Sequence, residues 1–316
     1  MSTASILDIQ DLSVDIPTDS STLHAVRGIS LELNRGETLG IVGESGSGKS
    51  MTALALMNLL PPAARRQASC IDFDGSDLTH ATERELASKI RGQRIGMIFQ
   101  EPMTALNPVR TIGDQVAEGL RLHLGLSDAD ALDRAVAMLE RVGLPRSRFS
   151  PGLYPHQLSG GQRQRVVGAI GISSDPSVII ADEPTTSLDV TIQAAYLRLL
   201  RRLQVEQGVA IVFITHDFGI IAKMCHRVAV MYAGRIVEMA DVRTIFDNPL
   251  HEYTKALINS VPKMEVDVDR LTQLDGQPPQ LHDLPPGDAF APRSKLKFRP
   301  EDARMRPPFV EVEPGH

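Results

Sequence analysis

Residues 38–50 read TLGIVGESGSGKS, a short apolar run followed by a loop that holds three glycines, three serines and a lysine. The last eight of these residues match the pattern GxxxxGK(S/T). Glycines allow backbone N–H groups to curl around an anion, and the N-terminus of a following helix adds partial positive charge. We therefore predict that the loop binds the phosphates of ATP, with Lys49 on the β- and γ-phosphates and the Ser50 hydroxyl on Mg²⁺. The predicted nucleotide-binding residues are Gly43, Glu44, Ser45, Gly46, Ser47, Gly48, Lys49, Ser50 and Met51.

Strands and helices are expected to alternate around this loop. Apolar runs predict strands at 6–14, 30–33, 38–42, 95–99, 177–181 and 209–215. Helices are expected at 49–60, within 106–144, and at 163–171 and 191–207, and Pro61 is expected to stop the first of them. Buried strands that alternate with helices indicate an α/β fold with a largely parallel sheet. The helical segment from about 101 to 165 is expected to be an insertion.

Two carboxylates follow the apolar run at 178–181. A buried parallel strand delivers them at its carboxyl end, where open α/β sheets bind their ligands. We predict that Asp182 joins the shell of Mg²⁺ and that Glu183 acts as the general base for the attacking water. An ordinary acidic turn would explain the pair alone, but it is a remote alternative beside the glycine loop. Because in-line attack needs an acceptor for the water proton, the sequence predicts ATPase activity.

A second glycine loop, LSGGQ at 158–162, precedes a helical run. The chain thus has two candidate phosphate-binding loops, but only one of them carries a lysine. The simplest interpretation is that Ser159, Gly160, Gly161 and Gln162 act on a nucleotide held by a second copy or by a sister chain. Catalysis would then require a dimer.

Two further polar residues end apolar strands. Gln100 closes the run at 95–99 and could reach Mg²⁺ or the attacking water. His216 follows the run at 209–215, where its ring could donate a hydrogen bond to the γ-phosphate. A lone glutamine or histidine is more often structural, so both assignments depend on the neighbouring motifs.

Together these motifs resemble those of an ATP-binding cassette (ABC) subunit over residues 1–250. The resemblance makes 43–50 the Walker A motif, 178–183 Walker B and 158–162 the signature loop. Gln100 then matches the Q-loop, Ser187-Leu188-Asp189 the D-loop, with Asp189 as its site residue, and His216 the switch histidine. It implies a P-loop NTPase (RecA-like) core with an antiparallel β subdomain, and an inserted helical signature subdomain at about 101–165.

The stretches 100–108 and 251–257, together with Val261-Pro262, narrow the resemblance to the cassettes of dipeptide and oligopeptide importers. Residues 251–316, which hold 10 of the 21 prolines, would be the C-terminal extension of that class. The resemblance implies two transmembrane permease subunits, an extracytoplasmic solute-binding protein and a second cassette. It favours a sister cassette over a homodimer and places the chain on the cytoplasmic face of the membrane. Nickel and some oligosaccharide importers carry similar cassettes.

The sequence departs from this family in two ways. Related importers often bind an iron–sulfur cluster near a Phe-x-Pro-Arg-Cys element, but residues 290–294 read FAPRS and no cysteine follows Cys225, so we expect no cluster. Many cassettes stack adenine on an aromatic residue upstream of Walker A. Here no Phe, Tyr or Trp precedes Phe73, so that role is vacant or falls to His24, which leaves GTP use open.

Charge, apolar runs and motif spacing argue against several other classes of protein. The net charge of −6 argues against a nucleic-acid partner, and no apolar run approaches the roughly 18 to 20 residues that span a bilayer. We also expect no signal peptide. A soluble cassette of DNA repair or translation would show a long coiled coil or two cassettes, whereas Asp182 follows Lys49 by 133 residues with no heptad run. A P-loop kinase or GTPase would leave LSGGQ unexplained.

Overall fold

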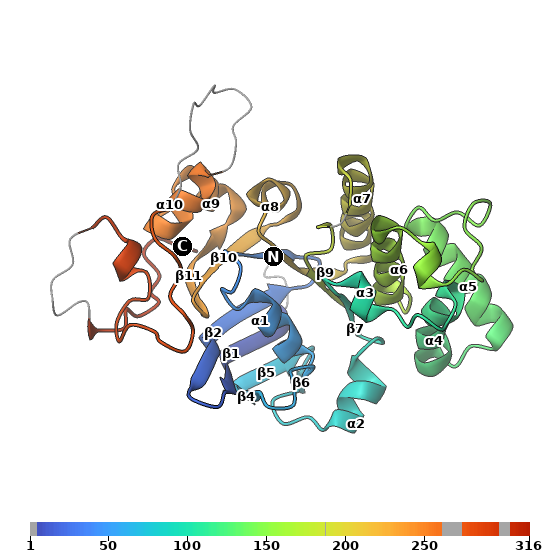
Figure 1. Cartoon of the computed structure of the whole chain (residues 1–316), viewed down its shortest axis with the longest axis horizontal. Helices are drawn as coiled ribbons and strands as arrows, with labels where there is room; N and C mark the ends of the chain where they lie inside the picture. Colours follow the sequence, from blue (N-terminus) through green and yellow to red (C-terminus); the bar gives the residue numbers. More distant parts are fainter. Residues whose placement is uncertain (1–4, 187, 261–273, 297–303) are drawn as a thin grey trace. The chain divides into compact units, whose positions relative to one another are not determined.

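The computed structural model describes residues 5–186, 188–260, 274–296 and 304–316 (Figure 1). By the contacts between its Cα atoms the chain divides into two compact units. Unit 1 holds residues 1–6, 33–38 and 80–214. Unit 2 holds residues 7–32, 39–79 and 215–316. None of the helices in the described ranges is long and apolar enough to cross a membrane.

Parallel strands form the centre of unit 1. They are β7 (Ile95–Ile98), β8 (Val178–Asp182) and β9 (Ala210–Thr215), the last of which belongs to this unit through Ile214. Val178 of β8 pairs with Ile95 of β7 and with Ala210 of β9. Every residue of the three strands is buried, as expected of a parallel sheet covered on both faces. The predicted apolar runs are therefore confirmed as strands, and their carboxyl ends meet at one edge of the sheet.

Helices make up most of the rest of unit 1. They are α2 (Glu83–Glu85), the π-helical turn η1 (Leu86–Ile90), α3 (Pro102–Ala105), α4 (Ile112–Leu124), α5 (Asp128–Arg141), the 3₁₀ turn η2 (Pro155–Gln157), α6 (Gly160–Ile172) and α7 (Val190–Gln207). The predicted helical region at 106–144 is two helices, because Gly125 ends α4 in the left-handed conformation and Ser127 caps α5. Helices α4, α5 and α6 pack on one another.

Unit 2 contains an antiparallel sheet, drawn in blue and cyan in Figure 1. Its strands are β1 (Ser5–Pro17), β2 (Thr22–Asn34), β4 (Arg65–Gln67), β5 (Cys70–Phe73) and β6 (Ser76–Asp77), in the order β2-β1-β5-β6 with β4 also on β1. The first two residues of β1 and the last two of β2 belong to unit 1. This confirms the predicted antiparallel subdomain. Strand β2 begins eight residues before the predicted run at 30–33. Polar residues and Gly28, whose φ is 64°, interrupt the apolar pattern over its first half.

The remaining strands of unit 2 flank the glycine loop. Strand β3 (Thr38–Val42) runs parallel to β10 (Arg227–Tyr232), which pairs antiparallel with β11 (Arg235–Asp241). The helices are α1 (Lys49–Leu56), α8 (Phe218–Met224), α9 (Val242–Asp247), α10 (Glu252–Asn259) and the 3₁₀ turn η3 (Ala291–Arg293).

Helix α1 is shorter than predicted. The sequence predicted a helix through Leu60 with Pro61 as its stop, and this was wrong by four residues. Asn58 adopts a left-handed φ of 51°, and the N–H of Leu59 reaches back to the carbonyl of Leu54. The helix therefore ends by a local reversal at Asn58, a residue type that tolerates this conformation, before the prolines are reached.

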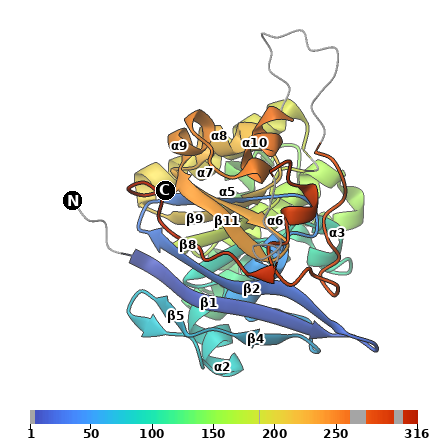
Figure 2. The same ribbon diagram turned by 90° about the vertical axis from the view of Figure 1, so that its left-hand side faces the viewer.

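The C-terminal residues contact β11 within unit 2. Figure 2 shows the end of the chain beside β11, where Arg235 donates a hydrogen bond of 3.3 Å to the Pro307 carbonyl. The His316 ring lies 2.7 Å from Glu238, and both side chains are buried. The described part of residues 251–316 contains α10 and η3 and no strand. The predicted elements Ser187 and Val261-Pro262 lie outside the described residues.

Candidate nucleotide-binding site

The loop between β3 and α1 leaves no room for side chains at two of its glycines. A Cβ on Gly43 would lie 2.1 Å from the Met231 carbonyl oxygen, and one on Gly48 would lie 2.4 Å from the Ala25 carbonyl oxygen. Gly48 has a φ of 103° and Gly46 one of 77°, both in the region that favours glycine. The backbone itself therefore forms the loop surface, as a phosphate-binding cradle requires.

Lys49, the first residue of α1, lies inside this loop. Its side chain is 6% exposed, and its ammonium donates hydrogen bonds of 2.8 Å to the carbonyls of Gly43 and Glu44 and of 3.3 Å to the Ser47 hydroxyl. The loop thus holds a positive charge at the N-terminus of a helix whose own dipole is positive there. This arrangement fits the predicted binding of nucleotide phosphates.

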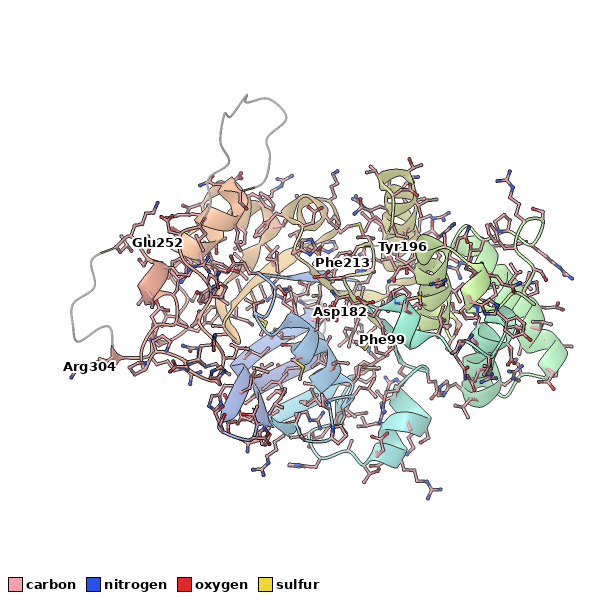
Figure 3. All side chains as sticks on the ribbon, in the orientation of Figure 1. Phe99, Asp182, Tyr196, Phe213, Glu252 and Arg304 are labelled. Carbon is pink, nitrogen blue, oxygen red and sulfur yellow. The ribbon has the colours of Figure 1, made fainter. Side chains whose placement is uncertain are left out.

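The carboxylates predicted in Walker B lie at the edge of the sheet in unit 1. Asp182 ends β8 and is 5% exposed; Figure 3 labels it beside Phe99, which follows β7. Glu183 adopts a φ of 44°, unusual for a residue with a side chain, and its N–H donates to the Ile214 carbonyl at 3.0 Å. Backbone strain of this kind concentrates at functional sites.

The Glu183 carboxylate is held by two donors. Gln100 donates to its Oε2 at 3.2 Å, and the Thr186 hydroxyl donates to the same oxygen at 2.9 Å. The structure therefore brings together two residues that the sequence proposed separately, the Q-loop glutamine and the general base. Thr186 was missed. Its position three residues after Glu183 was the only signal available for it.

The signature residues form the start of α6. Ser159 caps the helix: its hydroxyl accepts the Gln162 N–H at 3.3 Å, and the Gln162 side chain accepts the Ser159 N–H at 2.8 Å. Ser159 and Gly160 are exposed. One turn farther, the buried Gln164 donates to the Phe99 carbonyl at 3.1 Å, so the signature helix contacts the residue next to Gln100.

The other predicted residues also lie at helix starts. Asp189 is exposed and caps α7 by accepting the Ile192 N–H at 3.0 Å. His216 is exposed and follows β9, just before the cap of α8 at Asp217. The predicted residues thus fall into two sets: 43–51 and His216 in unit 2, and the others in unit 1. Ser50 in unit 2 carries a hydroxyl oxygen, and Gln100 and Asp182 in unit 1 carry amide and carboxylate oxygens; each is a hard donor of the kind that Mg²⁺ prefers.

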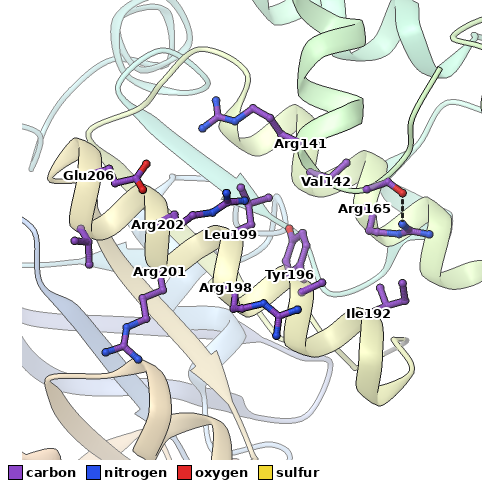
Figure 4. A pocket seen from close by; sticks show the side chains of 13 residues that line it. Arg141, Val142, Arg165, Ile192, Tyr196, Arg198, Leu199, Arg201, Arg202 and Glu206 are labelled. Carbon is purple, nitrogen blue, oxygen red and sulfur yellow. Dashed lines mark hydrogen bonds between the residues drawn. The ribbon is translucent and has the colours of Figure 1, made fainter. Parts of the chain in front are cut away.

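A cavity of about 660 Å³ lies elsewhere in unit 1, lined by α7, by the C-terminal end of α5 and by Arg165 of α6 (Figure 4). Five arginines line it, and one of them, Arg165, donates a hydrogen bond of 2.6 Å to the Gly143 carbonyl. None of the predicted site residues lines this cavity.

Sequence reasoning missed the residues that contact the glycine loop from the C-terminal part of the chain. The Tyr253 hydroxyl accepts the Glu44 N–H at 2.8 Å, and Arg293 forms an ion pair with the Glu44 carboxylate. Burial raises the pKa of the Tyr253 hydroxyl, which therefore stays protonated. No local pattern could have indicated these contacts, because 209 and 249 residues separate the partners.

The sequence matches two family models. Residues 26–186 match the model described as ABC transporter, and residues 237–299 match the C-terminal region of oligopeptide/dipeptide transporters. Among curated proteins, the dipeptide transport ATP-binding protein DppD of Lactococcus lactis subsp. cremoris is 47% identical over 100% of this chain and 90% of its own length. The oligopeptide transport ATP-binding protein OppD of Bacillus subtilis is 46% identical over 98% of this chain and 87% of its own length.

Solved structures give the same result for the fold. The ATP-binding cassette MJ0796, in a dimeric post-hydrolysis state bound to ADP and Pi, matches 75% of this chain and 99% of its own length with a TM-score of 0.68 and 26% identity. CbiO1 of Clostridium perfringens, part of the transporter complex cbiONQ, matches 77% of this chain and 91% of its own length with a TM-score of 0.62 and 29% identity.

Proposed function

The chain belongs to the ATP-binding subunits of ABC transporters of the dipeptide and oligopeptide class, and we propose that it couples ATP binding and hydrolysis to peptide uptake. The observation that carries the proposal is the presence, on one chain, of the cassette and of the C-terminal region that marks peptide transporters. In this proposal Lys49 binds the phosphates of ATP and Glu183 accepts the proton of the attacking water.

Binding is assigned to the glycine loop. Its backbone N–H groups would surround the phosphates, and Lys49 would carry the positive charge that meets the β- and γ-phosphates. Ser50 and Asp182 would hold Mg²⁺, with Gln100 as a further oxygen donor; when bound, the ion neutralises charge on the phosphates. The role of stacking on adenine is vacant or falls to His24, whose ring is half-exposed and lies 2.7 Å from Asp15.

Hydrolysis is assigned to Glu183. Its carboxylate would accept a proton from the attacking water, while Gln100 and Thr186 hold that carboxylate in a fixed orientation. His216 would donate a hydrogen bond to the γ-phosphate. The chain's contribution is therefore to orient the base and to position the phosphates.

Function would require a second cassette. The exposed Ser159 at the start of α6 supports a role toward a partner's nucleotide, and the similar cassette MJ0796 is dimeric. We propose a sister subunit as the partner, with a second copy as the other arrangement. When the dimer closes, the movement would be transmitted to two permease subunits by two contacts. One is between Gln164 and Phe99, and the other is the packing of α3 on α6.

This assembly would sit on the cytoplasmic face of the membrane and receive peptides from an extracytoplasmic binding protein. The test is uptake by the chain reconstituted with its permeases and binding protein. We expect labelled di- or oligopeptides to accumulate only with ATP and not with the Lys49→Ala variant. ATP-dependent uptake of nickel or an oligosaccharide, without peptide uptake, would contradict the proposal.

A further inference from the structure

One buried arginine joins the C-terminal extension to the Walker A loop. Arg293 of η3 has a side chain that is 4% exposed, and Glu44, the second residue of GESGSGKS, has one that is 30% exposed. The two guanidinium nitrogens donate to the two carboxylate oxygens at 2.7 and 3.2 Å. Such a two-pronged pair fixes both the position and the orientation of the carboxylate.

Arg293 is itself held in place by other parts of unit 2. Its Nε donates to the Asp275 carbonyl at 3.0 Å, and its guanidinium lies 5.8 Å from the ring centre of Tyr232. Burial lowers the pKa of Arg293, but hydrogen bonds to Glu44 and Tyr232 outweigh this effect and the pKa is raised. The cation that faces Glu44 is therefore permanent.

Glu44 connects Arg293 to the lysine of the loop. Its N–H donates to the Tyr253 hydroxyl at 2.8 Å, and its carbonyl accepts from the Lys49 ammonium at 2.8 Å. Tyr253 packs on Tyr232 with ring centres 4.6 Å apart and on Phe290 at 5.8 Å. A displacement of Glu44 would therefore displace an acceptor of Lys49.

Hydrogen bonds hold the segment that carries Arg293 on both sides of the arginine. The Ser294 hydroxyl donates to the Glu252 carboxylate of α10, which also accepts the Lys295 N–H at 3.2 Å. Upstream, the Leu281 carbonyl accepts the His24 N–H of β2 at 3.1 Å. Ser294 thus helps to place the arginine.

We propose that Arg293 is a positioning residue for ATP, which neutralises Glu44 and holds the Walker A loop in its binding conformation. The inference rests on the proposed binding of ATP by that loop. Without Arg293, the Glu44 carboxylate would stand uncompensated beside the negatively charged phosphates, and the loop would lose its tie to the extension. Affinity for ATP would fall, while the contacts of Glu183 in unit 1 would be unchanged.

The test is equilibrium binding of MgATP to the full chain, together with KM and kcat for phosphate release. We expect Arg293→Met to weaken binding and to raise KM about tenfold, with kcat within about twofold of wild type. In a Glu44→Gln background the same substitution is expected to cost less than about threefold, because the repelling charge is gone. Lys295→Met is the matched control: it removes a cation from the same segment, an exposed ammonium that lies 3.8 Å from the exposed Asp275 carboxylate, and is expected to bind ATP like wild type.

Two results would overturn the inference: an Arg293→Met affinity within twofold of wild type, or an equal loss in both backgrounds. If Arg293→Met does not fold, Arg293→Lys replaces it, because it keeps the charge but loses one of the two hydrogen bonds. Its affinity is then expected to lie between wild type and a tenfold loss, and a wild-type value would refute the inference. ATP binding by the Lys49→Ala variant tells a failure of this inference from a failure of the proposed function. If ATP binding is the same with and without Lys49, the assignment of ATP to the loop is itself wrong.

Discussion

Gly43→Ala tests whether the Walker A loop depends on the close backbone approach seen in unit 2. The added Cβ would lie 2.1 Å from the Met231 carbonyl oxygen and 2.8 Å from the Ser47 hydroxyl, whereas ordinary contact begins at 3.4 Å. The loop or β10 must therefore move by about 1.3 Å, the difference between 3.4 and 2.1 Å. A misplacement of about 1 Å can lower the rate of an enzyme about 100-fold. We expect kcat/KM for ATP to fall by about that factor and the free energy of unfolding by about 1–3 kcal/mol.

The assay is steady-state phosphate release, with thermal unfolding measured on the same samples. Gly46→Ala provides a graded comparison, because no atom lies within 4 Å of its Cβ and only its φ of 77° is unfavourable. Its loss should be smaller, with about 1–2 kcal/mol of strain. Gly119→Ala in α4 is the control, since its Cβ would lie at least 3.7 Å from its neighbours. It should keep full activity and gain up to about 1 kcal/mol of stability.

The steric argument predicts that Gly43→Ala loses the most activity, Gly46→Ala less and Gly119→Ala none. A Gly43→Ala enzyme with kcat/KM within threefold of wild type would refute the steric argument. So would a Gly46→Ala enzyme that is more impaired than Gly43→Ala. If Gly43→Ala cannot be purified in folded form, the loss of folding exceeds the expected range, and the magnitude given above is wrong.

Other outcomes can be measured on the same protein. Thr186→Val removes the hydroxyl that donates to Glu183 and should lower kcat about tenfold with little change in KM, whereas an unchanged kcat would count against this role. His251 has a pKa lowered by burial, and its Nδ1 accepts the Tyr253 N–H, so the unfolded chain binds the proton more readily than the folded one. Stability should therefore be lost as the pH falls below about 6.5, and less steeply in His251→Gln; equal slopes in denaturant titrations would contradict this. ATPase activity should rise more than linearly with protein concentration, and strictly linear activity in a verified monomer would remove the dimer from the proposal.

The sequence predicted the parts of the site that depend on local pattern. A glycine loop between a strand and a helix, and carboxylates at the end of a buried strand, are each specified within about a dozen residues. That is why 43–50, Asp182 and Glu183 could be placed in advance. The parallel geometry of β7 and β8 then accounts for the contact between Gln100 and Glu183.

Other features depended on backbone conformation or on distant contacts. The end of α1 at Asn58 and the strained φ of Glu183 are left-handed conformations that the residue types permit but do not require. The pairing of Arg293 with Glu44 depends on how the chain folds over a separation of 249 positions, and an arginine in a proline-rich segment gives no sign of its partner. Positions set by a local pattern could therefore be predicted from the sequence, whereas contacts between residues far apart in the chain could not.

Phosphate release by Glu183→Gln is the most direct test of the account. The variant keeps the size of the side chain and removes the carboxylate that is proposed to accept the water proton, so ATP should still bind. We expect release to fall about 100-fold or more, the range that a positioned general base contributes. A rate equal to that of the wild-type protein would contradict the central claim that this chain hydrolyses ATP through Glu183.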